Sequence, residues 1–213
     1  MLTNRGRVVF GVLFAALVLA VAATSAIAQE NRFKVYVAAG FLSPLDSSDA
    51  ELGEQVDKFE VRDEIGFGVG FEWRPNPVLG LELDYFGASQ DIEFGGARIA
   101  ETDVAPLTLA VNFHFARKHR FDVYVGPLVS YVSWGEIEFT PEIAAAIGQS
   151  SVSAESETAV GAQIGVDITV NSRFAIVTGV RYLDFSITPE GATATGSLGV
   201  DPLIVRVGAA WRW

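Results

Sequence analysis

The chain has 213 residues, half of them hydrophobic and 19% charged, with a formal net charge of −11 and no cysteine. This composition excludes a disordered chain, a disulfide scaffold and thiol chemistry, and the length fits one domain. The acidic balance, without a basic stripe, argues against nucleic acid as a partner.

Residues 1–28 have the pattern of a secretory signal peptide. Arg5 and Arg7 precede an apolar run over residues 8–23, and residues 26–28, Ala-Ile-Ala, have the small-x-small form of a cleavage site. The run is shorter than the ~20 residues that a membrane-spanning helix needs. We therefore expect cleavage before Gln29 and a single mature domain over residues 29–213.

In the mature chain, hydrophobic residues alternate with polar or small residues over eight segments. Successive side chains leave a strand on opposite sides, so this period of two predicts strands with one apolar face. The predicted strands are residues 32–42, 64–74, 78–88, 104–116, 121–133, 157–170, 173–187 and 203–213.

The connections between these strands alternate long and short. The short turns are residues 75–77, 117–120 and 171–172, and the long loops are residues 43–63, 89–103, 134–156 and 188–199. An even number of strands, short turns at one end and long loops at the other are typical of outer-membrane barrels. The expected fold class is therefore all-β, an eight-stranded antiparallel up-and-down transmembrane β-barrel in the bacterial cell outer membrane.

A soluble barrel would turn its apolar side inward. Here the face opposite the apolar one is too rich in glycine and charge to form a soluble core. Aromatic residues ring the apolar face at the strand ends, as expected for contact with membrane lipid and lipopolysaccharide. These aromatic residues are Phe33, Trp73, Tyr85, Phe113, Phe115, Phe121, Tyr131, Tyr182, Trp211 and Trp213.

The face predicted to line the lumen carries charges of both signs. The expected network is Glu72, Glu82, Asp84, Arg181, Arg206 and Arg212. Because eight strands leave a lumen that side chains can fill, we expect a plug of paired charges in the lower lumen, with Arg206 and Arg212 as partners of the carboxylates. The alternative is a polar constriction that selects or gates a solute.

No catalytic, cofactor or metal site is expected. A lipid-modifying enzyme would need a nucleophile and a base, usually histidine, near the outer leaflet, but His114 lies low in its strand and His119 in a short turn. Their neighbours also lack the spacing of metal ligands. Gly66, Gly68 and Gly70 recur every second residue with no helix after them, which indicates small lumen positions and not a phosphate loop.

The third long loop contains a short helix pattern. Thr140 is a candidate N-cap, Pro141 takes the first helical position and Gly148 follows the end. Apolar residues in an exposed loop suggest a lid over the barrel mouth, formed by Ile143, Ala144, Ala145 and Ile147.

Several segments resemble OmpW-type outer-membrane proteins, and the resemblance covers the mature chain. They are Ala105-Pro106-Leu107-Thr108-Leu109, Tyr124-Val125-Gly126, Gly161 to Asp167 running to Asn171 and Arg173, Tyr182-Leu183-Asp184, and Asp201-Pro202. The chain departs from that family at Ala105, where a second proline is frequent, at Leu203, where an aromatic residue often follows Asp-Pro, and in ending on tryptophan and not phenylalanine.

This resemblance implies an apolar pocket that opens outward, a closed periplasmic end and passage of small hydrophobic molecules sideways through the wall. The pattern Arg206-x-Gly208-x-x-Trp211-x-Trp213 is also similar to the terminal signal read by the outer-membrane assembly machinery, with Gly208, Trp211 and Trp213 as its expected residues. The leading hypothesis is thus a barrel that binds or admits small hydrophobic molecules. The alternative is a closed structural or adhesive surface barrel of the OmpX-like kind, without a transport role.

Overall fold

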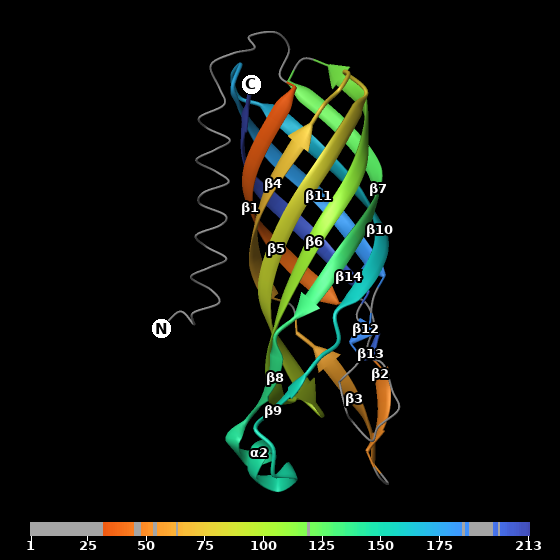
Figure 1. The fold of residues 1–213 in the computed structure, drawn as a ribbon, viewed down its shortest axis with the longest axis vertical. Helices are drawn as coiled ribbons and strands as arrows, with labels where there is room; N and C mark the ends of the chain where they lie inside the picture. The colour runs from red at the N-terminus through yellow and green to blue at the C-terminus, as the bar shows by residue number, and fades with distance from the viewer. Residues whose placement is uncertain are drawn as a thin grey trace.

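The computed structural model describes residues 32–44, 48–52, 55–62, 64–118, 120–184, 186–187, 198–199 and 201–213. The predicted signal peptide and His119 lie outside the described residues. In the described part of the chain, eight antiparallel strands form the barrel wall (Figure 1). They are β1 (Phe33–Pro44), β4 (Glu64–Trp73), β5 (Leu79–Phe94), β6 (Ala97–Lys118), β7 (Phe121–Trp134), β10 (Glu157–Thr169), β11 (Phe174–Asp184) and β14 (Pro202–Arg212).

The barrel closes because each of these strands pairs with two neighbours. The order runs β5-β4-β1-β14-β11-β10-β7-β6, and the pairing of β6 with β5 completes the ring. Each pair is antiparallel, so the predicted eight-stranded up-and-down barrel is confirmed. Within the described ranges, no helix has the length and apolar character needed to cross a membrane.

Side chains alternate between the two faces of the wall as the sequence predicts. On β14, Val205 and Val207 are 44% and 57% exposed on the outer surface, whereas Arg206 between them is 6% exposed and points into the lumen. The barrel thus has an apolar outer face and charged side chains in its lumen, unlike a water-soluble barrel.

The long connections contain more regular structure than the sequence suggests. The prediction of a loop over residues 89–103 is wrong, because β5 and β6 continue through this segment. The two strands meet at a turn where Gly95 and Gly96 adopt positive φ angles of 58° and 79°. The alternation continues there, with Ile92 and Ala100 buried on the inner face. The two strands therefore project beyond the barrel as part of an extension (Figure 1).

Shorter strands complete this extension. Strand β3 (Gln55–Val61) pairs with β5 and with β2 (Ser48–Leu52), while β8 (Glu136–Phe139) pairs with β6 and with β9 (Ser151–Ser153). The predicted strand 173–187 is divided into β11 and β12 (Ser186–Ile187), and β12 pairs with β13 (Leu198–Gly199).

Helix α2 (Pro141–Ile147) forms where the sequence predicts a helix. Pro141 is at its N-terminus, and Gly148 ends it with a φ of 72° while its backbone N–H donates to the Ala144 carbonyl. The helix lies at the far tip of the β8–β9 hairpin and none of its residues is buried (Figure 1). The residues predicted as a lid, including Ile147, therefore do not cover the barrel mouth in this structure, because pairing of β8 with β6 carries them away from it.

Glycines on the lumen face make room for aromatic side chains. A methyl group at Gly40 would lie 2.6 Å from Cε2 of Phe86, so only glycine lets that ring lie against the wall. Phe86 also covers Gly66, in agreement with the interpretation of that glycine as a small lumen position. Two further pairs are Tyr36 over Gly70 and Tyr124 over Gly165.

Candidate functional site

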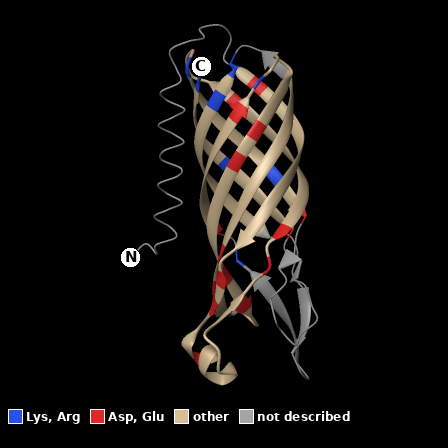
Figure 2. Cartoon of the chain, in the orientation of Figure 1, with Lys and Arg blue, Asp and Glu red and all other residues tan. Residues whose placement is uncertain are grey.

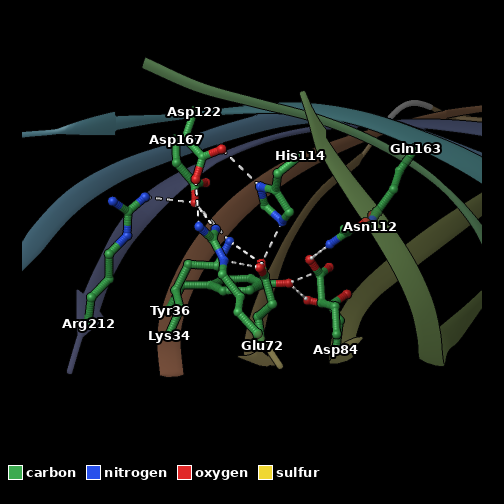
Figure 3. Close-up of polar contacts among 12 residues, drawn as sticks. Lys34, Tyr36, Glu72, Asp84, Asn112, His114, Asp122, Gln163, Asp167 and Arg212 are labelled. Carbon is green, nitrogen blue, oxygen red and sulfur yellow. Dashed lines mark hydrogen bonds and ion pairs between the residues drawn. The ribbon is translucent and has the colours of Figure 1, made fainter. Parts of the chain in front are cut away.

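The half of the lumen next to the short turns contains a cluster of buried ionisable side chains, which we call the lower cluster (Figure 3). It consists of Lys34, Glu72, Arg74, His114, Asp122, Asp167 and Arg212. Six barrel strands contribute to it, and Arg74 directly follows β4. Asp167 Oδ2 accepts hydrogen bonds from Arg212 Nη2 at 2.8 Å, from Lys34 Nζ at 2.9 Å and from Arg74 Nη2 at 3.1 Å.

The other two carboxylates of the lower cluster share His114 and Arg74. Glu72 lies 2.5 Å from Lys34 Nζ and 3.0 Å from His114 Nε2, and it also accepts a hydrogen bond from Arg74. Asp122 lies 2.5 Å from Arg74 Nη1 and 2.9 Å from His114 Nδ1. The imidazole of His114 is therefore held between two carboxylates, where it links β6 to β4 and β7.

A second group of charges, the middle cluster, lies further from the short turns. It consists of Glu82, Asp84, Arg181 and Arg206. Arg181 contacts Asp84 at 2.5 Å and Glu82 at 3.1 Å, and Arg206 contacts the same carboxylates at 3.2 Å and 2.9 Å. Each guanidinium thus bridges both acidic side chains, and each acidic side chain is shared by both arginines.

Neutral side chains complete the hydrogen bonding of the middle cluster. Arg206 Nη1 donates to the hydroxyl of Tyr36 at 2.8 Å, and that hydroxyl donates to Glu82 at 2.9 Å. Gln163 Oε1 accepts from Arg206 at 3.2 Å, and Asn112 Nδ2 donates to Glu82 at 2.9 Å. The network crosses the full width of the lumen at this height.

The two clusters are balanced in charge. The lower cluster sets Lys34, Arg74 and Arg212 against three carboxylates, with His114 in addition, and the middle cluster sets two arginines against two carboxylates. Buried charge is tolerated when it is paired and hydrogen-bonded, whereas loss of one partner leaves a costly uncompensated charge. This balance allows so many charges to occupy a narrow lumen.

Beyond the middle cluster the lumen becomes apolar. The change falls within one lumen position of β5, since Asp84 belongs to the middle cluster and Phe86, two residues further on, belongs to a hydrophobic cluster. We call this region the apolar chamber. It is a group of buried side chains that pack on one another: Leu42, Phe86, Ala88, Ile92, Ala100, Val104, Ala110, Leu128, Val132, Ile137, Ala159, Leu183 and Ile204.

The six charges predicted for the lumen network are all buried inside the barrel. Glu82, Asp84, Arg181 and Arg206 meet as expected, but Arg212 contacts Asp167 and not Glu72. The sequence interpretation missed Arg74, which it placed next to a turn. Arg74 lies two residues after the lumen residue Glu72, so the period of two places it on the same face of the strand. This position was the signal that could have identified Arg74 as a lumen residue.

The residues of the predicted assembly signal lie on the strand that ends at the short-turn rim. Trp213 exchanges backbone hydrogen bonds with Phe33 at 3.0 and 3.1 Å, and its ring stacks on that phenylalanine at 6.0 Å. Trp211 packs edge-on against Phe174 at 4.5 Å. Gly208 packs so closely against β1 that a methyl group there would meet the carbonyl of Val37.

A closed antiparallel barrel with an apolar outer face, a charged lumen and short turns at one end defines an outer-membrane β-barrel protein. The chain belongs to the family "Outer membrane protein beta-barrel domain", whose model matches residues 14–212. It is therefore a protein of the bacterial outer membrane, surrounded by lipid and lipopolysaccharide, with its short turns at the periplasmic side.

Relatives with related sequences carry the name outer membrane protein W. The Escherichia coli K12 protein is 25% identical over 199 residues, which is 89% of this chain and 92% of the relative. The Salmonella typhi protein is 24% identical over 177 residues, or 80% and 82% of the two chains. Their shared name agrees with the OmpW-type resemblance of the sequence.

Solved structures share the fold. OprG from Pseudomonas aeruginosa matches with a TM-score of 0.70 at 21% identity, covering 85% of this chain and 95% of that one. AlkL, solved in lipid bilayers, matches with a TM-score of 0.61 at 16% identity, covering 90% and 94%.

Proposed function

We propose that this barrel binds or admits small hydrophobic molecules in its apolar chamber, and that the lower and middle clusters close its periplasmic end. The observation that carries the proposal is the change along β5 from Asp84, which is paired with two arginines, to Phe86 in the apolar chamber. A hydrophobic solute gains free energy in the chamber but would have to break buried ion pairs to go further.

A solute stopped at this height must leave through the wall, and an interruption between β5 and β6 supports such an exit. Between the backbone pairs Tyr85–Leu107 and Ala88–Val104, two positions on each strand are not paired across β5 and β6, and one of these positions on β6 is Pro106. Proline has no N–H to donate to a ladder, so a sheet is weakened where it occurs. This interruption is level with Phe86, at the height of the apolar chamber.

A second interruption provides a matched control. The pairing of β6 with β7 skips the positions between Ala110–Leu128 and Phe113–Val125, where Pro127 lies. Pro127 faces outward, and the adjacent lumen residue on β6 is Asn112 of the polar network. The interruption at Pro106 is level with Phe86, whereas the one at Pro127 begins at the height of the middle cluster, because Ala110 pairs with Leu128 on one side and with Glu82 on the other.

Uptake of a hydrophobic substrate by cells with and without the gene tests the proposal. We expect faster uptake with the gene, slower uptake with Pro106→Val, which restores a backbone donor, and unchanged uptake with Pro127→Val. Equal rates with and without the gene would refute transport. Equal rates for the two proline variants would refute the exit between β5 and β6 alone.

The closed surface barrel remains the second candidate, because the side chains of the apolar chamber pack against one another. Val132 and Leu183 are completely buried and Leu42 is 1% exposed. Planar-bilayer recordings separate the two candidates. Reproducible conductance, or its block by a detergent-like ligand, supports the channel, whereas silence together with unchanged uptake supports the closed barrel.

A further inference from the structure

The exposed charged side chains differ between the two ends of the barrel. Figure 2 shows basic and acidic residues at the end near the C terminus and mainly acidic residues along the extension. The exposed acidic residues of the extension include Glu101, Asp103, Glu136, Glu138 and Glu142. At the periplasmic end, by contrast, the charged side chains described as exposed are those of Arg32, Arg120 and Arg173.

These three arginines share a sequence pattern. Each directly precedes a phenylalanine at the start of a strand that runs outward from the periplasmic side, and the pairs are Arg32-Phe33, Arg120-Phe121 and Arg173-Phe174. Phe121 and Phe174 are 54% and 45% exposed on the outer wall. In each pair the phenylalanine begins the strand and the arginine lies one residue nearer the periplasmic side.

The backbone fixes all three arginines at the rim in the same way. The carbonyl of Arg32 accepts a hydrogen bond from Arg74 N, that of Arg120 from Thr169 N, and that of Arg173 from Arg212 N, each at 2.7 Å. In addition, the guanidinium of Arg173 lies 5.7 Å from the ring of Trp211, one of the aromatic residues of the rim. The arginines are therefore positioned by the barrel wall itself.

Their spacing follows from the order of the strands. Strands β1, β11 and β7 are separated by one strand each, β14 and β10. Neighbouring strands lie about 4.8 Å apart, so successive arginines are about 10 Å apart along the rim. The backbone positions of the three arginines are therefore regularly spaced along the rim, at the level where a membrane presents its headgroups.

We propose that these three Arg-Phe pairs form a binding arc for the phosphate groups of phospholipids in the periplasmic leaflet, with preference for anionic headgroups. Guanidinium recognises phosphate through paired hydrogen bonds, and arginine near a membrane surface is attracted to anionic lipid. Aromatic rings beside it occupy the interface between headgroups and acyl chains. The arc is independent of any solute in the lumen.

The experiment uses the full mature barrel folded in phosphatidylcholine vesicles that contain brominated phosphatidylglycerol. Three of the four tryptophans, Trp73, Trp211 and Trp213, lie near this rim, so quenching of their fluorescence reports lipid bound there. We expect phosphatidylglycerol to be enriched over phosphatidylcholine next to the wild-type barrel. In the double variant Arg120→Gln/Arg173→Gln, this preference for phosphatidylglycerol should fall about fivefold for each arginine replaced. Arg120→Lys/Arg173→Lys should keep most of it.

The matched control is Arg62→Gln/Arg98→Gln, which removes the same charge from two exposed arginines of the extension. Equal lipid preference in the two double glutamine variants would overturn the proposal. Displacement of phosphatidylglycerol by inorganic phosphate at constant ionic strength would also overturn it, since the site would then hold free phosphate. A gel shift on heating verifies that each variant is folded.

Discussion

Replacing Arg206 with methionine should destabilise the barrel strongly. Arg206 contacts Glu82 at 2.9 Å, Asp84 at 3.2 Å and the Tyr36 hydroxyl at 2.8 Å, all inside the lumen. Its removal leaves two buried carboxylates with Arg181 as their remaining arginine partner. Breaking a buried ion pair from one side costs about 3–5 kcal/mol. We therefore expect Arg206→Met to lower the free energy of unfolding by about that amount.

The assay is urea-induced unfolding in phospholipid vesicles, followed by tryptophan fluorescence. The control is Arg98→Met, because that side chain is 47% exposed and its pairs with Asp91 and Glu101 contribute less than about 1 kcal/mol. In the double variant Arg206→Met/Asp84→Asn the charges of the middle cluster balance again. Its loss of unfolding free energy should therefore be about 1–3 kcal/mol smaller than the sum of the losses in the two single variants.

The same variants should differ in conductance. Loss of Arg206 opens part of the middle cluster to water and should raise ion conductance in planar bilayers, whereas Arg98→Met should leave it unchanged. If Arg206→Met alters neither stability nor conductance more than Arg98→Met does, paired charges do not close the lumen.

Three further predictions concern single elements of the barrel. Gly165→Val should abolish the gel shift on heating, because the ring of Tyr124 occupies the space of the added side chain. Asn171→Ala should cost about 1 kcal/mol in urea unfolding, because its side-chain oxygen accepts two backbone hydrogen bonds in the turn before β11, each at 2.9 Å. Ile147→Ser, in contrast, should leave the urea midpoint unchanged, since helix α2 buries none of its residues; a lowered midpoint would show that the helix packs elsewhere.

The strands and the direction of their side chains could be predicted from the sequence because both depend on a period of two. The outward position of Val205 and the inward position of Arg206 follow from that period alone. The same reasoning failed for residues 89–103, where glycine and polar residues suggest a loop. There β5 and β6 continue because each strand provides the hydrogen-bonding partner of the other, and pairing of this kind is not a local property of either segment.

The ion-pair partners could be predicted only in part. Arg206 meets Glu82 and Asp84 as expected, but the partner of Arg212 is Asp167, from β10, a strand that is not adjacent to β14. Such a contact across the lumen depends on strand tilt and register, which set the height of each residue. Neither quantity can be read from the alternation of residues in one strand.

The most direct test of the proposed function is photolabelling of the folded barrel in vesicles with a hydrophobic alkyl diazirine, followed by mass spectrometry of the labelled residues. If small hydrophobic molecules enter the apolar chamber, lumen residues such as Leu42, Val132 and Leu183 become labelled, and excess unlabelled substrate removes this labelling. Labelling restricted to outward residues such as Val205 and Val207 would show that the probe meets only the lipid-facing wall, and would contradict the account.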